Sequence, residues 1–133
     1  MTTDLQVKAW AAEAKRAFYF LEASGYQALT PRLDVTWGAL TYLGAKLGVR
    51  VEFETDCCFM YVALFRPDRP EHDNSKYLQA CLRRLDLPAE LLQQVLALRG
   101  DFANLTRMVA LFANSLRLNL SILESRVDSL FPL

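Results

Sequence analysis

Residues 49–54 alternate strictly between apolar and charged side chains, and this alternation is the clearest structural signal in the chain. A period of two is typical of a strand that has one buried face and one solvent-facing face. The next run, residues 59–65, is apolar at every position. Such a run indicates a strand that is buried on both faces or that meets a partner on one. The sequence therefore predicts two strands joined by a short turn.

A two-residue turn at Asp56 and Cys57 would pair these strands in one register. The inner face would then be apolar throughout, with the pairs Phe53–Met60, Val51–Val62 and Val49–Leu64. A shift of one residue would exchange the two faces, because successive side chains point to opposite sides of a sheet.

The outer face in this register combines large apolar side chains with charges, as the centres of protein interfaces do. The alternative is that the chain's own helices cover this face. The pairs would be Glu54–Phe59, Glu52–Tyr61 and Arg50–Ala63, with Phe65 beyond them. The candidate partner-binding residues are accordingly Arg50, Glu52, Glu54, Phe59, Tyr61 and Phe65.

Helical periodicity flanks this central region on both sides. A first helix is predicted from the N-cap Asp4 to Ser24 and Gly25, with its apolar face at Val7, Trp10, Ala14, Phe18 and Leu21. A short edge strand is expected near residues 32–37, after a proline, and a polar loop at 66–75. Further helices are predicted at about 75–85, 88–99 and from 101 to 127 or beyond. The predicted fold is one α+β domain over residues 1–133: a three- to four-stranded antiparallel β-meander at about 32–66, an N-terminal helix and three C-terminal helices.

The last predicted helix carries two apolar stripes, which suggests a role in self-association. One stripe runs from Phe102 to Leu130 and can face the sheet. Unbroken, this helix would span about 43 Å, longer than the roughly 36 Å diameter of a globule of this size. It would then either protrude and pair with a second copy or break near Asn119. The second stripe, about 115° round the helix, favours a homodimer, with cover by the preceding helices as the alternative. That stripe consists of Met108, Leu111, Leu118 and Ile122.

Composition narrows the classes of function. Fifteen basic and fifteen acidic residues cancel, whereas nucleic-acid binders usually carry a basic excess, so no nucleic-acid partner is expected. The 53% of hydrophobic residues and a mean hydropathy of +0.10 hint at more apolar surface than one core needs. Charges interrupt the N-terminal segment, and no apolar run is long enough to cross a membrane. Three cysteines without metal or disulfide spacing fit a cytoplasmic protein.

Chemical signatures are sparse. His72 is a lone histidine in a polar loop, and the adjacent Cys57 and Cys58 have no basic neighbour to activate a thiolate. Glu52 and Glu54 would lie about 7 Å apart on one strand face, a spacing compatible with paired-carboxylate chemistry. No cofactor, metal or catalytic group is predicted. The alternative is a small-ligand-binding protein or enzyme that uses Glu52, Glu54 and Tyr61.

Two short patterns carry a resemblance in layout: Phe20-Leu21-x-x-x-Gly25-Tyr26 and Val49-x-Val51-x-Phe53. The chain resembles small uncharacterised bacterial α+β proteins, some of which are grouped with the immunity proteins of toxin–antitoxin-like competition systems. The resemblance implies a cytoplasmic protein without catalysis and a partner surface rich in acids and aromatics, for which Glu52, Glu54 and Tyr61 could serve. The leading hypothesis is therefore a non-enzymatic module that binds another protein. A small secretion-type chaperone is a variant of it.

Overall fold

The computed structural model of the chain describes residues 2–69, 74–98 and 100–132. Within these residues the strands form a six-stranded antiparallel sheet in the order β1-β3-β4-β5-β6, with β2 also paired to β3. Its centre consists of β3 (Trp37–Leu43), β4 (Gly48–Glu54) and β5 (Phe59–Phe65). Three two-residue strands complete it: β1 (Gln27–Ala28), β2 (Arg32–Leu33) and β6 (Lys76–Tyr77). The α+β class and the antiparallel meander are confirmed, although the sheet has more strands than predicted.

The predicted register of β4 and β5 is confirmed at every pair. Phe53 pairs with Met60 and Val51 with Val62, and the turn between the strands is closed by a hydrogen bond from the Cys58 N–H to the carbonyl of Thr55. All six inner-face side chains of the two strands are fully buried: Val49, Val51, Phe53, Met60, Val62 and Leu64. The alternation in the sequence therefore reports the two faces of the sheet correctly.

The N-terminal helix is interrupted where the sequence predicted one continuous element. It consists of α1 (Thr3–Ala17) and α2 (Tyr19–Ala23), separated at Phe18. The cap is Thr2, whose side chain accepts a hydrogen bond from the Leu5 N–H, so the prediction of Asp4 was wrong by two residues. Gly25 has a φ of 95°, a conformation that glycine adopts without strain, and it follows the helix as predicted. The predicted apolar face is buried at all five positions.

The C-terminal half contains α3 (Leu78–Arg84), α4 (Glu90–Leu96), the 3₁₀ turn η2 (Phe102–Asn104), α5 (Leu105–Ser125) and α6 (Val127–Leu130). Asp101 caps this last segment as predicted, because its side chain accepts a hydrogen bond from the Ala103 N–H. The chain leaves the helix at Arg126 and not at Asn119, so α5 has 21 residues and spans about 31 Å. The prediction of a protruding helix was therefore wrong: α5 fits within the globule.

Asn119 explains why α5 continues through a polar position. Its side chain is almost fully buried, and its amide donates to the carbonyl of Ser115 one turn earlier and to that of Pro88, just before α4. A buried amide with partners of this kind does not break a helix, because its hydrogen-bonding groups are satisfied inside the protein. Asn119 instead ties α5 to the segment before α4.

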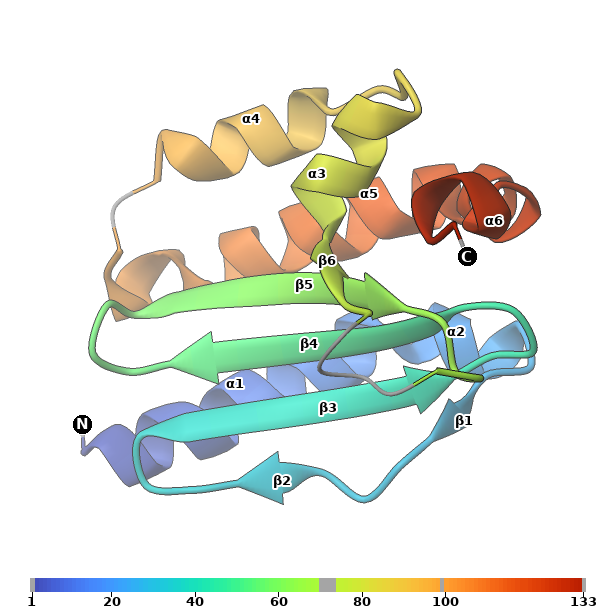
Figure 1. Ribbon diagram of the computed structural model, residues 1–133. Helices are drawn as coiled ribbons and strands as arrows, with labels where there is room; N and C mark the ends of the chain where they lie inside the picture. The colour runs from blue at the N-terminus through green and yellow to red at the C-terminus, as the bar shows by residue number, and fades with distance from the viewer. Residues whose placement is uncertain (1, 70–73, 99, 133) are drawn as a thin grey trace.

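The helices lie on one side of the sheet and beyond one of its edges (Figure 1). α1 and α5 lie behind β3, β4 and β5, and Trp10 of α1 stacks on Phe53 of β4 with 5.5 Å between the ring centroids. α3 and α4 lie beyond β5, where α4 packs on α5. No helix crosses the front of β3 and β4 in this view (Figure 1). Within residues 2–69, 74–98 and 100–132, none of the helices combines the length and apolar character needed to span a bilayer.

Candidate functional site

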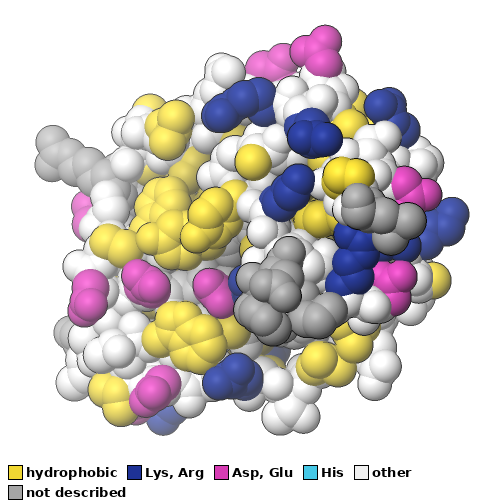
Figure 2. All heavy atoms as spheres, in the orientation of Figure 1, with side chains coloured by type: hydrophobic (Ala, Val, Ile, Leu, Met, Phe, Trp, Pro, Cys, Tyr) yellow, Lys and Arg dark blue, Asp and Glu magenta, His cyan; other side chains and the backbone are white. Residues whose placement is uncertain are grey.

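The outer face of the sheet, defined here as the side of β3–β5 that points away from α1 and α5, displays the predicted partner-binding residues. Cross-strand pairing places Glu54 of β4 between Trp37 of β3 and Phe59 of β5. The next outward row places Glu52 between Ala39 and Tyr61. Figure 2 shows acidic side chains in a row between two hydrophobic patches on this side of the molecule. The sequence correctly predicted the carboxylates and aromatic rings of β4 and β5 as neighbours.

The two glutamates differ in their surroundings. The Glu52 carboxylate lies 2.9 Å from the Arg50 Nε, and both side chains are about three-quarters buried, with 25% and 20% exposed. An open cavity of about 470 Å³ adjoins this pair, and Ser75, which precedes β6, also lines it. Glu54 is exposed at the other end of β4. Glu52 is therefore held by an internal ion pair beside a cavity, whereas Glu54 is exposed at the open end of the strand.

Phe65 does not belong to the accessible part of this face, which corrects its prediction as a partner-binding residue. Its side chain is only 4% exposed. The ring lies over Gly48, its cross-strand partner, so closely that a Cβ at that position would overlap it. Because Gly48 has no side chain, β4 offers a hollow that the Phe65 ring fills. The chain itself therefore covers Phe65, through the hollow at Gly48 of β4.

An aromatic cluster formed by Phe59, Tyr61 and Tyr77 borders the acids on the β5 side. The Phe59 and Tyr61 rings meet edge to face at 5.5 Å, and the Tyr61 and Tyr77 rings lie 5.8 Å apart. Phe59 also contacts the ring of Phe112 on α5, so it is partly buried against the core. Tyr77 is 57% exposed. Burial, the Cys57 thiol beside its hydroxyl and the nearby Glu54 raise the pKa of Tyr61 to about 12.

Trp37 borders the acids on the β3 side, and sequence reasoning did not assign it to the site. It is half-buried, and the guanidinium of Arg32 lies 5.6 Å from its ring centroid. Tyr77 was missed as well, since residues 75–85 were predicted as one helix whereas residues 76–77 form β6. The outward alternation of Trp37, Ala39 and Thr41 along β3 was the available signal for Trp37. For Tyr77 the pattern gave none, because a two-residue strand is too short to show a period.

The arrangement offers little for catalysis by the predicted carboxylates. The cavity beside Glu52 is lined by neither Glu54 nor Tyr61, so the described residues do not bring these three groups into one pocket. The described part of the chain contains no group of three or more potential metal ligands from His, Cys, Asp and Glu. His72 lies outside the described residues. Cys57 is exposed at the turn, 3.9 Å from the Tyr61 hydroxyl, whereas Cys81 is buried in the core.

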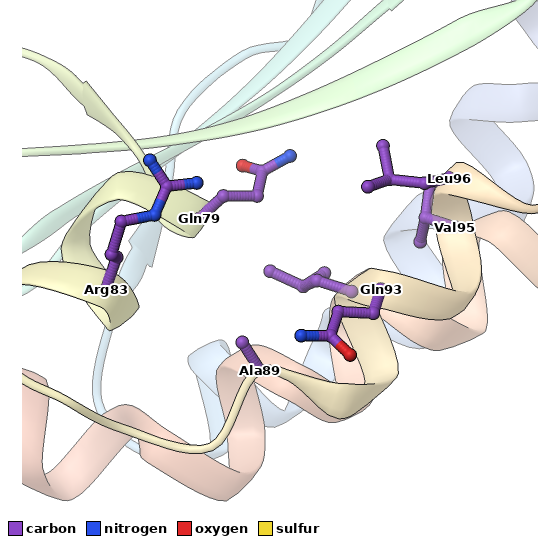
Figure 3. A pocket seen from close by; sticks show the side chains of 7 residues that line it. Gln79, Arg83, Ala89, Gln93, Val95 and Leu96 are labelled. Carbon is purple, nitrogen blue, oxygen red and sulfur yellow. The ribbon is translucent and has the colours of Figure 1, made fainter.

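A second concave surface lies between α3 and α4, away from the predicted site (Figure 3). This groove has a volume of about 230 Å³ and an apolar wall that includes Val95 and Leu96, the latter 80% exposed. Gln79 and Arg83 of α3 face Gln93 of α4 across it (Figure 3). Amides and a guanidinium can hydrogen-bond a ligand, but they form no acid–base pair at neutral pH.

The candidate self-association stripe on α5 is only half accessible. Met108 is fully buried and Leu111 is 8% exposed, and both belong to the same core cluster as the apolar residues of α4. Leu118 and Ile122 remain 65% and 44% exposed. The surface of two side chains is much smaller than the roughly 1,200 Å² of total area that specific interfaces bury. The homodimer stays a prediction, and its support on α5 is reduced to these two residues.

A function for this chain has to be argued from the geometry of the outer face. No protein family model, curated protein or solved structure matches the chain.

Proposed function

We propose that this protein is a non-enzymatic interaction module that binds another protein through the open, Glu54 end of the outer sheet face. The observation that carries the proposal is the alignment of Trp37, Glu54 and Phe59 across three strands, with no helix in front of them (Figure 1). Sheet faces of soluble domains that have no partner are usually polar. Here two aromatic groups flank the acids, and such residues dominate the binding energy of protein interfaces.

The composition of the surface supports a protein partner over other classes. The acids at this end of the sheet would repel the phosphates of a nucleic acid, and the zero net charge of the chain adds no attraction. Half-buried aromatic rings lose little conformational freedom when a partner covers them, so their burial contributes to affinity at low entropic cost. An immunity-like protein, which neutralises a partner by covering it, is one function that this kind of surface would serve.

The experiment that tests the proposal is affinity capture from the native host with matched variants. Tyr61→Ser removes an aromatic ring from the proposed interface, and Leu118→Ser removes an exposed side chain from the opposite layer on α5. We expect the protein captured by the unmodified chain to be lost, or to bind at least about tenfold more weakly, with Tyr61→Ser, and to be retained with Leu118→Ser. Circular dichroism confirms that both variants fold. Equal capture by both variants would contradict the assignment of the interface to the outer face.

A chaperone-like function is the second candidate, and exposed apolar residues beside β2 favour it. Leu33 is 45% exposed and Val35 is 56% exposed at this edge of the sheet. A short edge strand with unpaired backbone groups can accept an extended segment of a client by strand addition. In that case Leu33→Glu and Val35→Glu would reduce the capture of the client, and Tyr61→Ser would leave it unchanged.

A further inference from the structure

Glu54 carries a charge that none of the other described residues neutralises through an ion pair. Within the described residues no cationic group lies within ion-pair distance of its carboxylate, whereas Glu52, two residues earlier on the same strand, is paired with Arg50. Glu54 is also exposed, at the end of the sheet where the outer face is open. A partner that presents a positive charge here gains an attraction without first having to break an internal ion pair.

The two aromatic groups beside Glu54 are spaced to flank a cation. Trp37 and Phe59 stand on strands two positions apart, a separation of about 9.6 Å at roughly 4.8 Å per strand. A cation above Glu54, midway between them, would lie within the roughly 6 Å over which aromatic rings attract positive charge. The edge-to-face contact with Tyr61 holds the Phe59 ring in place. Carboxylate and rings would therefore act on the same positive group.

The protein already shows this kind of contact on the neighbouring strand. The guanidinium of Arg32 lies 5.6 Å from the centroid of the Trp37 ring. Arg32 comes from β2, which pairs with β3 on the edge opposite to β4. The Trp37 ring thus already holds one planar cation, and Glu54 is its cross-strand neighbour on β4. A guanidinium suits such a site better than an ammonium, because it stacks on a ring while it forms two parallel hydrogen bonds to a carboxylate.

We infer that Glu54, Trp37 and the Phe59–Tyr61 pair bind an arginine side chain of the partner protein. The inference rests on the proposed function, since it names the chemistry of the partner at the same surface. It predicts that the partner segment carries an arginine beside apolar side chains. The arginine would contact Glu54, and the apolar side chains would contact the aromatic cluster. Lysine would bind more weakly at the same place, because it lacks the planar face and the fork of donors.

A titration with short peptides tests the inference without knowledge of the partner. The probes are acetyl-Arg-Phe-Arg-Phe-amide and the same peptide with citrulline in place of both arginines, which keeps the shape and removes the charge. Two-dimensional amide NMR of the ¹⁵N-labelled chain follows binding residue by residue. We expect shifts at Trp37, including its indole N–H, and around residues 52–56 and 59–61. The arginine peptide should bind at least about fivefold more tightly than the citrulline peptide, as expected for one charge-assisted contact.

Two variants of equal net charge assign the effect to Glu54. Glu54→Gln should abolish the preference for arginine over citrulline. Glu13→Gln should leave it unchanged, because Glu13 lies on α1, away from the outer face, and pairs with Arg16. Equal affinity of the two peptides, an undiminished preference in Glu54→Gln, or shifts confined to the groove between α3 and α4 would overturn the inference. A failure of the arginine site can be distinguished from a failure of the proposed function. If the captured protein depends on Tyr61 but binds Glu54→Gln as tightly as the unmodified chain, the interface stands and only the arginine site is wrong.

Discussion

At the scale of single residues, burial separates groups that look alike in the sequence. Glu52 and Glu54 share a strand face, yet one is held by Arg50 and the other is exposed. Met108 and Leu118 share a predicted stripe, yet one is fully buried and the other is 65% exposed. The alternation of β4 and the period of α5 predict the direction of each side chain. They cannot predict cover, because cover comes from other segments of the chain: the shared core cluster for Met108, and the hollow at Gly48 for Phe65.

Cys81 provides a prediction about pH at this scale. Burial raises the pKa of its thiol from the ordinary value of 9.0 to about 11. Between these two values the unfolded chain loses the thiol proton and the folded chain keeps it, so the contribution of this group to stability is complete below pH 9 and is lost as the pH rises to about 11. Two pKa units correspond to at most about 2.7 kcal/mol. The free energy of unfolding should therefore fall over this range.

Urea denaturation at pH 8, 9, 10 and 11 measures this effect, with Cys81→Ala for comparison. The variant is expected to be less stable at pH 8, because it leaves a small cavity. The difference in unfolding free energy between the two proteins should shrink by about 2 kcal/mol towards pH 11. The reason is that the unmodified protein loses stability as the thiol ionises in its unfolded state, and the variant has no thiol at this position. A constant difference between the two proteins at all four pH values would show that Cys81 does not ionise differently in the folded and unfolded states. Cys57→Ser, at an exposed position, serves as the control.

At the scale of elements, strongly patterned segments could be predicted and most of the short ones could not. β4 and β5 have a full period-two pattern or an unbroken apolar run, and their register was predicted pair by pair. The two-residue strand β2 lies within the edge strand expected near residues 32–37. The two-residue strands β1 and β6 were not predicted, because such strands form where a neighbouring edge offers backbone partners, which no local pattern encodes. The end of α5 was also missed, since the apolar stripe continues into α6 beyond the break at Arg126.

Asn119 gives the prediction at this scale. Replacing it by alanine leaves the carbonyl of Pro88 without its donor and opens a small cavity between α5 and the segment before α4. The expected loss of stability is about 1–3 kcal/mol. Asn114→Ala on the same helix is the matched control, because Asn114 is exposed, and it should change the stability by less than about 0.5 kcal/mol. Urea denaturation of both variants checks the prediction, and similar losses in the two would contradict the role assigned to Asn119.

At the scale of the whole molecule, the fold divides the sheet into one face for stability and one for recognition. α1 and α5 bury the inner face completely, and Trp10 is 0% exposed there. The front of β3 and β4 carries no helix (Figure 1) and displays Trp37 and Glu54, and the aromatic cluster of β5 and β6 borders it. Half of this site could be predicted from the sequence, because β4 and β5 show their alternation clearly. The other half, from β3 and β6, depends on the order of the strands in the finished sheet.

The most direct test of this division uses the two tryptophans of the chain. Trp10 lies in the core and Trp37 is half-buried on the outer face. Acrylamide quenching of the free protein should therefore show one accessible and one protected component, and Trp37→Phe should remove only the accessible one. When the captured partner protein is bound, the accessible component should become protected. If Trp37 is already protected in the free protein, or stays equally accessible in the complex, the outer face is not the surface that the partner covers.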